Sequence, residues 1–230
     1  MNRNSLMYWF PLIEDLDIPM PETTFMSINR DEMLRVLDGR GKWPRFFEGD
    51  VKELAHAMGY PLFLRTDQAS GKHGWETTCY VENEDELLSH IHGVLDYNET
   101  NIFMGMDPYE ALVFREFIPL ASLFTAFQGL PIAKERRYFA KDGEVLCHHP
   151  YWIEDAVERG GPKREDWRSV LAEMNMEGME IPILTLYSKE VSEVLEGYWS
   201  VDYAMSKRGR WYLIDCALGD RSWHPECDRK

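Results

Sequence analysis

The sequence lacks the features of several protein classes. It has no long uninterrupted apolar run, and its first residues, MNRNSLMYWFPLIEDL, lack the apolar core of a signal peptide. Its few cysteines show no CxxC or other metal-ligand spacing, and a chain of 230 residues does not need disulfides to fold. They are Cys79, Cys147, Cys216 and Cys227. We therefore expect a cytoplasmic protein with free thiols and no membrane partner.

Positive charge is also scarce. The chain carries 25 Lys and Arg against 40 Asp and Glu, a formal net charge of −15, with no Lys/Arg run of the nucleic-acid-binding type. General nucleic-acid binding is therefore disfavoured, although a local basic pocket remains an open alternative. No Ser/His/Asp or Cys/His arrangement for covalent catalysis stands out. The 44% hydrophobic content suffices for one large domain or two lobes.

The C-terminal part contains a β-hairpin pattern with two acids. Residues 198–205 and 210–216 are rich in aromatic and β-branched residues and flank the polar turn at residues 206–209. Each run holds one acid, Asp202 or Asp215. If the connection has an even number of residues, both carboxylates lie on one face, diagonal across the strands and about 7–8 Å apart. That spacing suits a shared divalent cation, whereas the alternative is two solvent-facing acids.

The first 45 residues are predicted to form an extended N-terminal segment. The prolines in Tyr8-Trp9-Phe10-Pro11 and Ile18-Pro19-Met20-Pro21 favour an extended chain with a short strand over a helix. Residues 31–37 are expected to form a brief helix. Gly39-Arg40-Gly41-Lys42 is interpreted as a surface turn, because it lacks the spacing of a P-loop.

Residues 46–111 show the order helix, strand, glycine loop, strand, helix. Helical spacing of apolar residues predicts a helix at residues 50–58, followed by a strand at Leu62–Thr66. A polar loop and a strand at residues 77–81 follow, and Asn83 begins the second helix.

Residues 112–230 are strand-rich at first and helical later. Strands are predicted at residues 112–118, 132–140 and 144–149, and helices at 167–174 and 187–195. A Lys141-Asp142-Gly143 turn joins the second and third strands. Cys147-His148-His149 suggests zinc, but adjacent strand residues point to opposite faces, so core and surface roles are favoured.

Residues 45–220 resemble the ATP-grasp superfamily. In its last strands a pattern like V-D-V, a turn and Y-L-L-E-x-N supplies Mg²⁺ ligands, and Asp202 and Asp215 fall at its two acids. Ala217 replaces the family's Asn, so Asp220 or water is the expected third ligand. The strand from Glu135 to Phe139 resembles the E-x-R-x-F strand of a bacterial and phage clade defined by two arginines and a lysine. That clade is related to a eukaryotic translation-factor assembly chaperone.

The resemblance implies an α+β fold of two α/β lobes with the nucleotide bound between antiparallel sheets. Residues 46–111 would form the lid lobe and residues 112–230 the C-terminal lobe with the metal site. Strand alternation places Glu135 and Arg137 on one face and Arg136 on the other. The implied ATP-binding residues are Arg65, Lys72, Arg115, Glu116, Phe117, Ile118, Glu135 and Arg137.

The resemblance also implies a function. Arg137 and Lys72 would be catalytic by stabilising the transferring phosphoryl group, and residues 116–118 would bind the adenine. The implied reaction joins a carboxylate, activated by ATP and Mg²⁺ as an acyl phosphate, to an amine of a peptide, protein or small molecule. The alternative is an ATP-binding assembly chaperone without turnover, and the acidic chain would then suit a basic protein partner.

Overall fold

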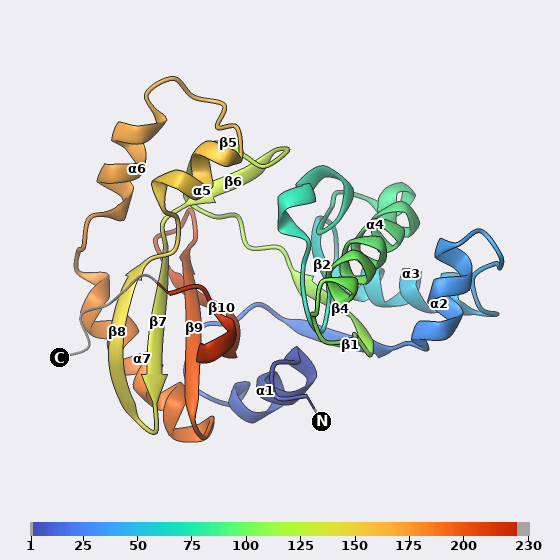
Figure 1. Ribbon diagram of the computed structural model, residues 1–230, viewed down its shortest axis with the longest axis horizontal. Helices are drawn as coiled ribbons and strands as arrows, with labels where there is room; N and C mark the ends of the chain where they lie inside the picture. The colour runs from blue at the N-terminus through green and yellow to red at the C-terminus, as the bar shows by residue number, and fades with distance from the viewer. Residues whose placement is uncertain (1, 225–230) are drawn as a thin grey trace. The chain divides into compact units, whose positions relative to one another are not determined.

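The computed structural model describes residues 2–224, which fall into two compact units (Figure 1). Unit 1 contains the described residues up to Met20, Pro119–Ala126, and those from Pro131 onward. Unit 2 contains Pro21–Ile118 and Phe127–Leu130. The chain leaves unit 2 after Ile118, so the strand expected at residues 112–118 lies in unit 2 and not in the C-terminal part.

Unit 2 is built on a four-stranded antiparallel sheet with strand order β1-β4-β2-β3. The strands are β1 (Thr23–Ser27), β2 (Leu62–Thr66), β3 (Tyr80–Val81) and β4 (Ala111–Glu116). The helices are α2 (Arg30–Leu37), α3 (Phe47–Met58), α4 (Glu84–Phe103) and the 3₁₀ helix η1 (Lys72–Thr77). Leu62, Leu64 and Phe114 on one sheet face pack with apolar residues of α3 and α4 into a buried core.

Most predicted elements of unit 2 are confirmed. The helices expected at residues 31–37 and 50–58 are α2 and α3, and the strand Leu62–Thr66 is β2. The strand expected at residues 77–81 shrinks to Tyr80–Val81, because η1 occupies residues 72–77. Gly71, at a φ of +64° that favours glycine, turns the chain into η1. Asn83 caps α4, as predicted, by accepting from the Asp85 N–H at 3.0 Å.

Unit 1 contains a second antiparallel sheet, with strand order β10-β9-β7-β8, and the pair β5-β6. The strands are β5 (Ser122–Ala126), β6 (Leu130–Ala133), β7 (Glu135–Lys141), β8 (Glu144–Pro150), β9 (Tyr198–Met205) and β10 (Trp211–Leu218). The helices are α1 (Leu6–Ile13), α5 (Glu154–Arg159), α6 (Trp167–Asn175), α7 (Glu180–Val194) and the 3₁₀ helix η2 (Gly219–Arg221). In Figure 1, α7 lies against β7 and β9, which it contacts.

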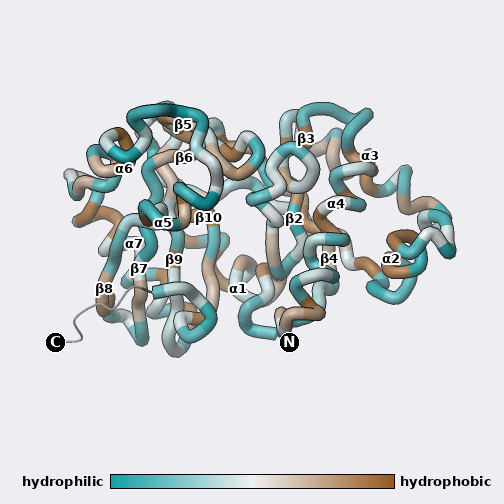
Figure 2. Tube along the Cα trace, turned by 45° about the horizontal axis from the view of Figure 1, so that its top comes forward, coloured by the Kyte–Doolittle hydropathy of each residue, from teal (hydrophilic) through white to brown (hydrophobic). Residues whose placement is uncertain are grey.

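The predicted hairpins of unit 1 are present. Asp142 and Gly143 both have positive φ and turn β7 into β8, as the Asp-Gly pair predicts. The predicted helix at residues 167–174 is α6, and α7 begins seven residues before the expected position 187. Helix α5 precedes α6, and Figure 2 shows hydrophilic residues along the connection between the two helices.

The N-terminal segment differs from the structure that its sequence predicts. The prediction of an extended chain is wrong for Leu6–Ile13, which forms α1 despite Pro11. Its buried residues Leu6, Trp9, Phe10 and Ile13 recur at helical spacing, and Ser5 caps the helix by accepting from the Met7 N–H. A short helix loses only one backbone bond to Pro11, whereas the apolar face gains burial.

The described residues 2–224 include no helix whose length and apolarity would let it cross a membrane.

Candidate functional site

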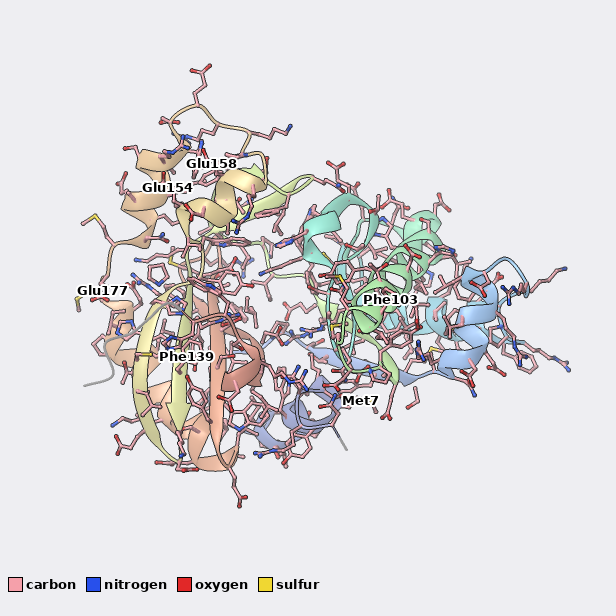
Figure 3. The ribbon with its side chains drawn as sticks, in the orientation of Figure 1. Met7, Phe103, Phe139, Glu154, Glu158 and Glu177 are labelled. Atoms are coloured by element: carbon pink, nitrogen blue, oxygen red, sulfur yellow. The ribbon has the colours of Figure 1, made fainter. Side chains whose placement is uncertain are left out.

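A row of polar side chains crosses the sheet of unit 1. Opposite residues on neighbouring strands are His149 and Arg137, Arg137 and Asp202, and Asp202 and Asp215. Directly opposed residues of antiparallel strands project to the same face. The four side chains therefore share one face of the sheet, to which β7 also contributes Phe139, labelled in Figure 3.

A β-bulge brings Asp215 opposite Asp202. Leu213 pairs with Tyr203, but the register shifts at Ile214 so that Asp215 pairs with Asp202. The connection runs from Ser206 to Arg210, an odd number of residues, which alone would set Ile214 opposite Asp202. The bulge shifts the register by one residue, so that Asp215 takes the place of Ile214 opposite Asp202. The two acids share a face, as expected, but lie directly opposite instead of diagonal.

Arg137 and Asp202 form a two-point ion pair. Arg137 Nε and Nη2 donate to the two Asp202 carboxylate oxygens at 2.7 Å each. The side chains are only 14% and 9% exposed, so water screens the pair weakly. Burial alone would lower the pKa of Arg137, but the Asp202 carboxylate raises it above its usual value. Arg137 therefore stays charged and neutralises one of the two neighbouring acids.

Two aromatic residues that the sequence analysis gave no role complete the surroundings of Arg137 and Glu135. The Tyr151 ring lies 4.7 Å from the Arg137 guanidinium carbon, a cation–π distance. Trp152 Nε1 donates to Glu135 Oε1 at 2.9 Å, and both residues are buried. The signal in the sequence is the Tyr-Trp pair directly after β8. Glu135 is thus held in place beside Arg137 on the same strand face.

Asp202 and Asp215 suit a metal ion that also binds phosphate. Carboxylate oxygens are the ligands that Mg²⁺ prefers, and it is usually held by one or two of them together with substrate phosphates. Asp220 lies on η2 and is exposed. Among residues 2–224, no three or more His, Cys, Asp or Glu side chains gather closely enough to hold a metal ion. Asp202, Asp215 and Asp220 therefore do not form such a group in the described part of the chain.

Ser200, which the sequence analysis did not identify, adds a neutral hydroxyl oxygen to the same face of the sheet. It lies two residues before Asp202 on β9 and directly opposite Ala217, the position of the family's Asn. Its hydroxyl donates to the Ala217 carbonyl at 3.3 Å and lies 2.5 Å from the Ser222 hydroxyl. In the sequence, only its position two residues before Asp202 indicates that Ser200 lies on the same strand face.

Arg136 points to the other face of β7, as strand alternation predicts. Its Nη2 donates to the carbonyls of Asn175 at 3.0 Å and Met176 at 2.8 Å, and to Glu180 at 3.2 Å. Lys134 also contacts Glu180, at 2.8 Å. Arg136 therefore joins β7 to the end of α6 and the start of α7. The two adjacent arginines therefore have different partners on opposite faces of β7.

Arg65 and Arg115 share one face of the sheet of unit 2. Leu62, Leu64 and Phe114 face the helices, so the alternate residues Arg65 and Arg115 project from the opposite face. Arg115 is opposite Phe63, which places it diagonal to Arg65 at about 7–8 Å. Arg115 Nε donates to Thr23 Oγ1 and Arg65 Nε to its neighbour's carbonyl, each at 3.0 Å.

Lys72 begins η1 and lies near the same region of unit 2. Burial raises the pKa of the Cys79 thiol to about 12, and the positive charges of Lys72 and Arg65 oppose that rise. Both cations are therefore close enough to act on a single buried thiol. Arg65 thus lies near Arg115 through the strand register and near Lys72 through their shared influence on Cys79.

Phe117 belongs to an aromatic cluster of unit 2 that the sequence analysis only partly identified. Its ring centroid lies 5.0 Å from Tyr80 and 6.3 Å from Trp75, which itself lies 6.2 Å from Phe63. Glu116 ends β4 and is exposed, and Ile118 is the last residue before the chain enters unit 1. Glu116, Phe117 and Ile118, which were expected to bind the adenine, thus lie at the end of unit 2, directly before the chain enters unit 1.

Solved structures of low sequence identity share the fold. C-terminally truncated Cdc123 from Schizosaccharomyces pombe matches with a TM-score of 0.61 and 12% identity, over 94% of this chain and 83% of that one. D-alanine–D-alanine ligase from Bacillus anthracis matches with a TM-score of 0.51 and 13% identity, over 94% of this chain and 56% of that one. No curated protein sequence matches the chain significantly.

A protein-family model matches residues 53–230, and it describes the ATP-grasp domain of family 3 in the clade named for two arginines and a lysine. That range includes the face of the unit 1 sheet that carries Arg137 and the face of the unit 2 sheet that carries Arg65 and Arg115. It does not include β1 with Thr23. The predicted resemblance and the predicted α+β ATP-grasp fold are confirmed. The chain belongs to this ATP-grasp family, the third of the clade with two arginines and a lysine.

Proposed function

We propose that this protein is an ATP- and Mg²⁺-dependent ligase that joins a carboxylate to an amine through an acyl phosphate. The observation that carries the proposal is the row Arg137, Asp202 and Asp215 on one sheet face of a chain that belongs to the ATP-grasp family. A cation for phosphate beside two carboxylates for a metal ion is the set that phosphoryl transfer needs. The fold shared with a D-alanine–D-alanine ligase supports a ligase.

The residues have separate tasks in this proposal. Arg137 binds a phosphate oxygen, and Asp202 and Asp215 hold Mg²⁺. When bound, Mg²⁺ neutralises charge that develops on the transferring phosphoryl group. Arg65, Arg115 and Lys72 orient the phosphates in this proposal, which the shared sheet face of Arg65 and Arg115 supports. Arg137 and Lys72 are the proposed catalytic residues.

The nucleotide base and the reacting groups complete the scheme. The backbone of residues 116–118 binds the adenine edge, and Phe117 and its aromatic neighbours flank the adenine ring. Glu135 orders the side chain of Arg137, which lies beside it on β7. The substrate carboxylate attacks the γ-phosphorus, and ADP leaves. The amine then attacks the acyl carbon, phosphate leaves, and the amine proton passes to solvent. Catalysis is electrostatic, because no covalent nucleophile of the protein is required.

A nucleotide-binding protein without turnover is the second candidate. Asp202 is engaged by Arg137, and within residues 2–224 no third acid, His or Cys joins the two acids in a group that could hold a metal ion. Ala217, at the position of the family's Asn, also offers no side-chain oxygen to a metal ion, which favours binding over turnover. Such a protein would bind Mg-ATP and a protein partner, and the formal charge of −15 favours a basic one.

ADP release measured with and without candidate amino acids and peptides separates the two functions. A ligase shows substrate-stimulated ADP release. Asp215→Asn should reduce this release by at least about 10²-fold, because losing only an outer partner of a metal ligand already costs about 10–100-fold. Asp220→Asn removes the same charge outside the row and should change the rate little. Mg-ATP binding without any stimulated release would support the binding protein instead.

A further inference from the structure

We propose that Asp202 determines specificity for the magnesium-bound nucleotide by competing with metal-free phosphate for Arg137. The inference rests on the proposed function, in which Arg137 binds phosphate and Asp202 binds Mg²⁺. In the structure these two residues bind each other. The pair must therefore open before either residue performs its proposed task.

The hydrogen bonds of Arg137 show what a phosphate has to displace. Nε and Nη2 form the edge of the guanidinium that accepts a two-point anion, and Asp202 occupies it at 2.7 Å from each nitrogen. Nη1 donates to the Trp223 carbonyl at 3.3 Å. Every nitrogen of the guanidinium thus already has an acceptor. A phosphate gains the Nε–Nη2 edge only by replacing the Asp202 carboxylate.

The charges around the pair oppose metal-free nucleotide. Phosphate that replaces Asp202 leaves a buried carboxylate without its counter-charge, directly opposite a second carboxylate, Asp215. The anionic phosphate also approaches both acids. Mg²⁺ alone meets the opposite obstacle, because the Arg137 cation lies beside Asp202.

Magnesium-bound nucleotide removes both obstacles in one step. The cation replaces Arg137 as the partner of Asp202, and a phosphate oxygen replaces Asp202 as the partner of Arg137. All charges then remain paired, which neither free ATP nor free Mg²⁺ achieves. The ion pair therefore couples the binding of metal and phosphate beyond the affinity of ATP for Mg²⁺ in solution.

The test is the affinity of the protein for ATP in the presence of EDTA, measured by titration calorimetry on the full chain. Asp202→Asn removes the competing charge from Arg137, so metal-free ATP should bind about tenfold more tightly than to wild type. Asp215→Asn is the matched control, because it removes the same charge from the same row, one strand farther from Arg137. Its gain should be below about threefold. Both variants should bind Mg-ATP more weakly.

Two results would overturn the inference. Equal gains in both variants would show that only the net charge matters, and no gain in Asp202→Asn would show that phosphate uses another edge of the guanidinium. If circular dichroism shows that Asp202→Asn is unfolded, Asp202→Ser carries the same expectation with a smaller side chain. Failure of wild type to bind even Mg-ATP would contradict the proposed function itself, so the two failures are distinguishable.

Discussion

Replacing Arg136 tests whether the two adjacent arginines have separate roles. The Arg136 side chain is 1% exposed and donates to two carbonyls at the end of α6 and to Glu180. Arg136→Met fills much of the volume but leaves these acceptors without that donor. Removing one partner of a buried pair costs about 3–5 kcal/mol. Lys134 still contacts Glu180 at 2.8 Å, so we expect the lower end, about 3 kcal/mol.

Urea unfolding followed by far-UV circular dichroism measures this loss. The midpoint should fall with an unchanged m-value, since m follows the surface exposed on unfolding. Glu180→Gln in the Arg136→Met background should cost less than in wild type, because the two residues are in contact. Arg136→Met should keep its Mg-ATP affinity under folding conditions, whereas Arg137→Met should lose at least about tenfold. Unchanged stability with lost Mg-ATP binding in Arg136→Met would refute the assignment of the two faces.

Three further predictions concern the same sheet. Asp202→Asn combined with Asp215→Asn should lose little Mg²⁺-dependent turnover beyond the worse single variant, because residues that act as a unit are not additive; multiplied losses in a steady-state assay would contradict one shared site. Trp152→Phe removes the indole donor to buried Glu135 and should lower the free energy of unfolding by about 1–3 kcal/mol in urea titrations; no change would mean that water replaces the donor. Burial lowers the pKa of His148, so the unfolded chain takes up the proton first and the free energy of unfolding falls as the pH drops below about 6.5. Urea midpoints should show a smaller fall for His148→Gln, and an identical pH profile would argue against burial of the imidazole.

The acidic hairpin shows how far the sequence predicts this site. Alternating apolar residues around Asp202 and Asp215 predict two strands, and the polar residues between them predict the turn. The bulge at Ile214 has no comparable signal, because a bulge depends on which backbone groups pair across two strands. The prediction of a shared face is confirmed, whereas the diagonal placement is wrong.

Contacts between segments far apart in the sequence were beyond reach of pattern analysis. The Arg137–Asp202 pair joins residues 65 positions apart, and Tyr151 reaches Arg137 only because β8 returns beside β7. Local patterns fix which face a strand residue occupies but not which charge lies opposite. The same limit explains Asp220, whose place after β10 gave no information on whether it reaches the two acids.

Proline signals misled the analysis of the N-terminal segment. Pro11 favoured an extended chain, yet Leu6, Trp9, Phe10 and Ile13 form the buried face of α1. The segment also supplies an acceptor to the edge strand β10, since the Pro19 carbonyl accepts from the Leu213 N–H at 2.8 Å. Tertiary burial outweighed local propensity here.

Binding of Mg-ATP tests the central claim most directly. Thermal melting of the full chain with increasing Mg-ATP should show a rising midpoint, since a ligand at a hundredfold excess over its dissociation constant adds about 2.7 kcal/mol of stability. The Arg137→Ala variant, compared with its own nucleotide-free melting point, should show a much smaller rise, because it lacks the proposed phosphate ligand. An unchanged melting point of wild type at millimolar Mg-ATP would contradict the account.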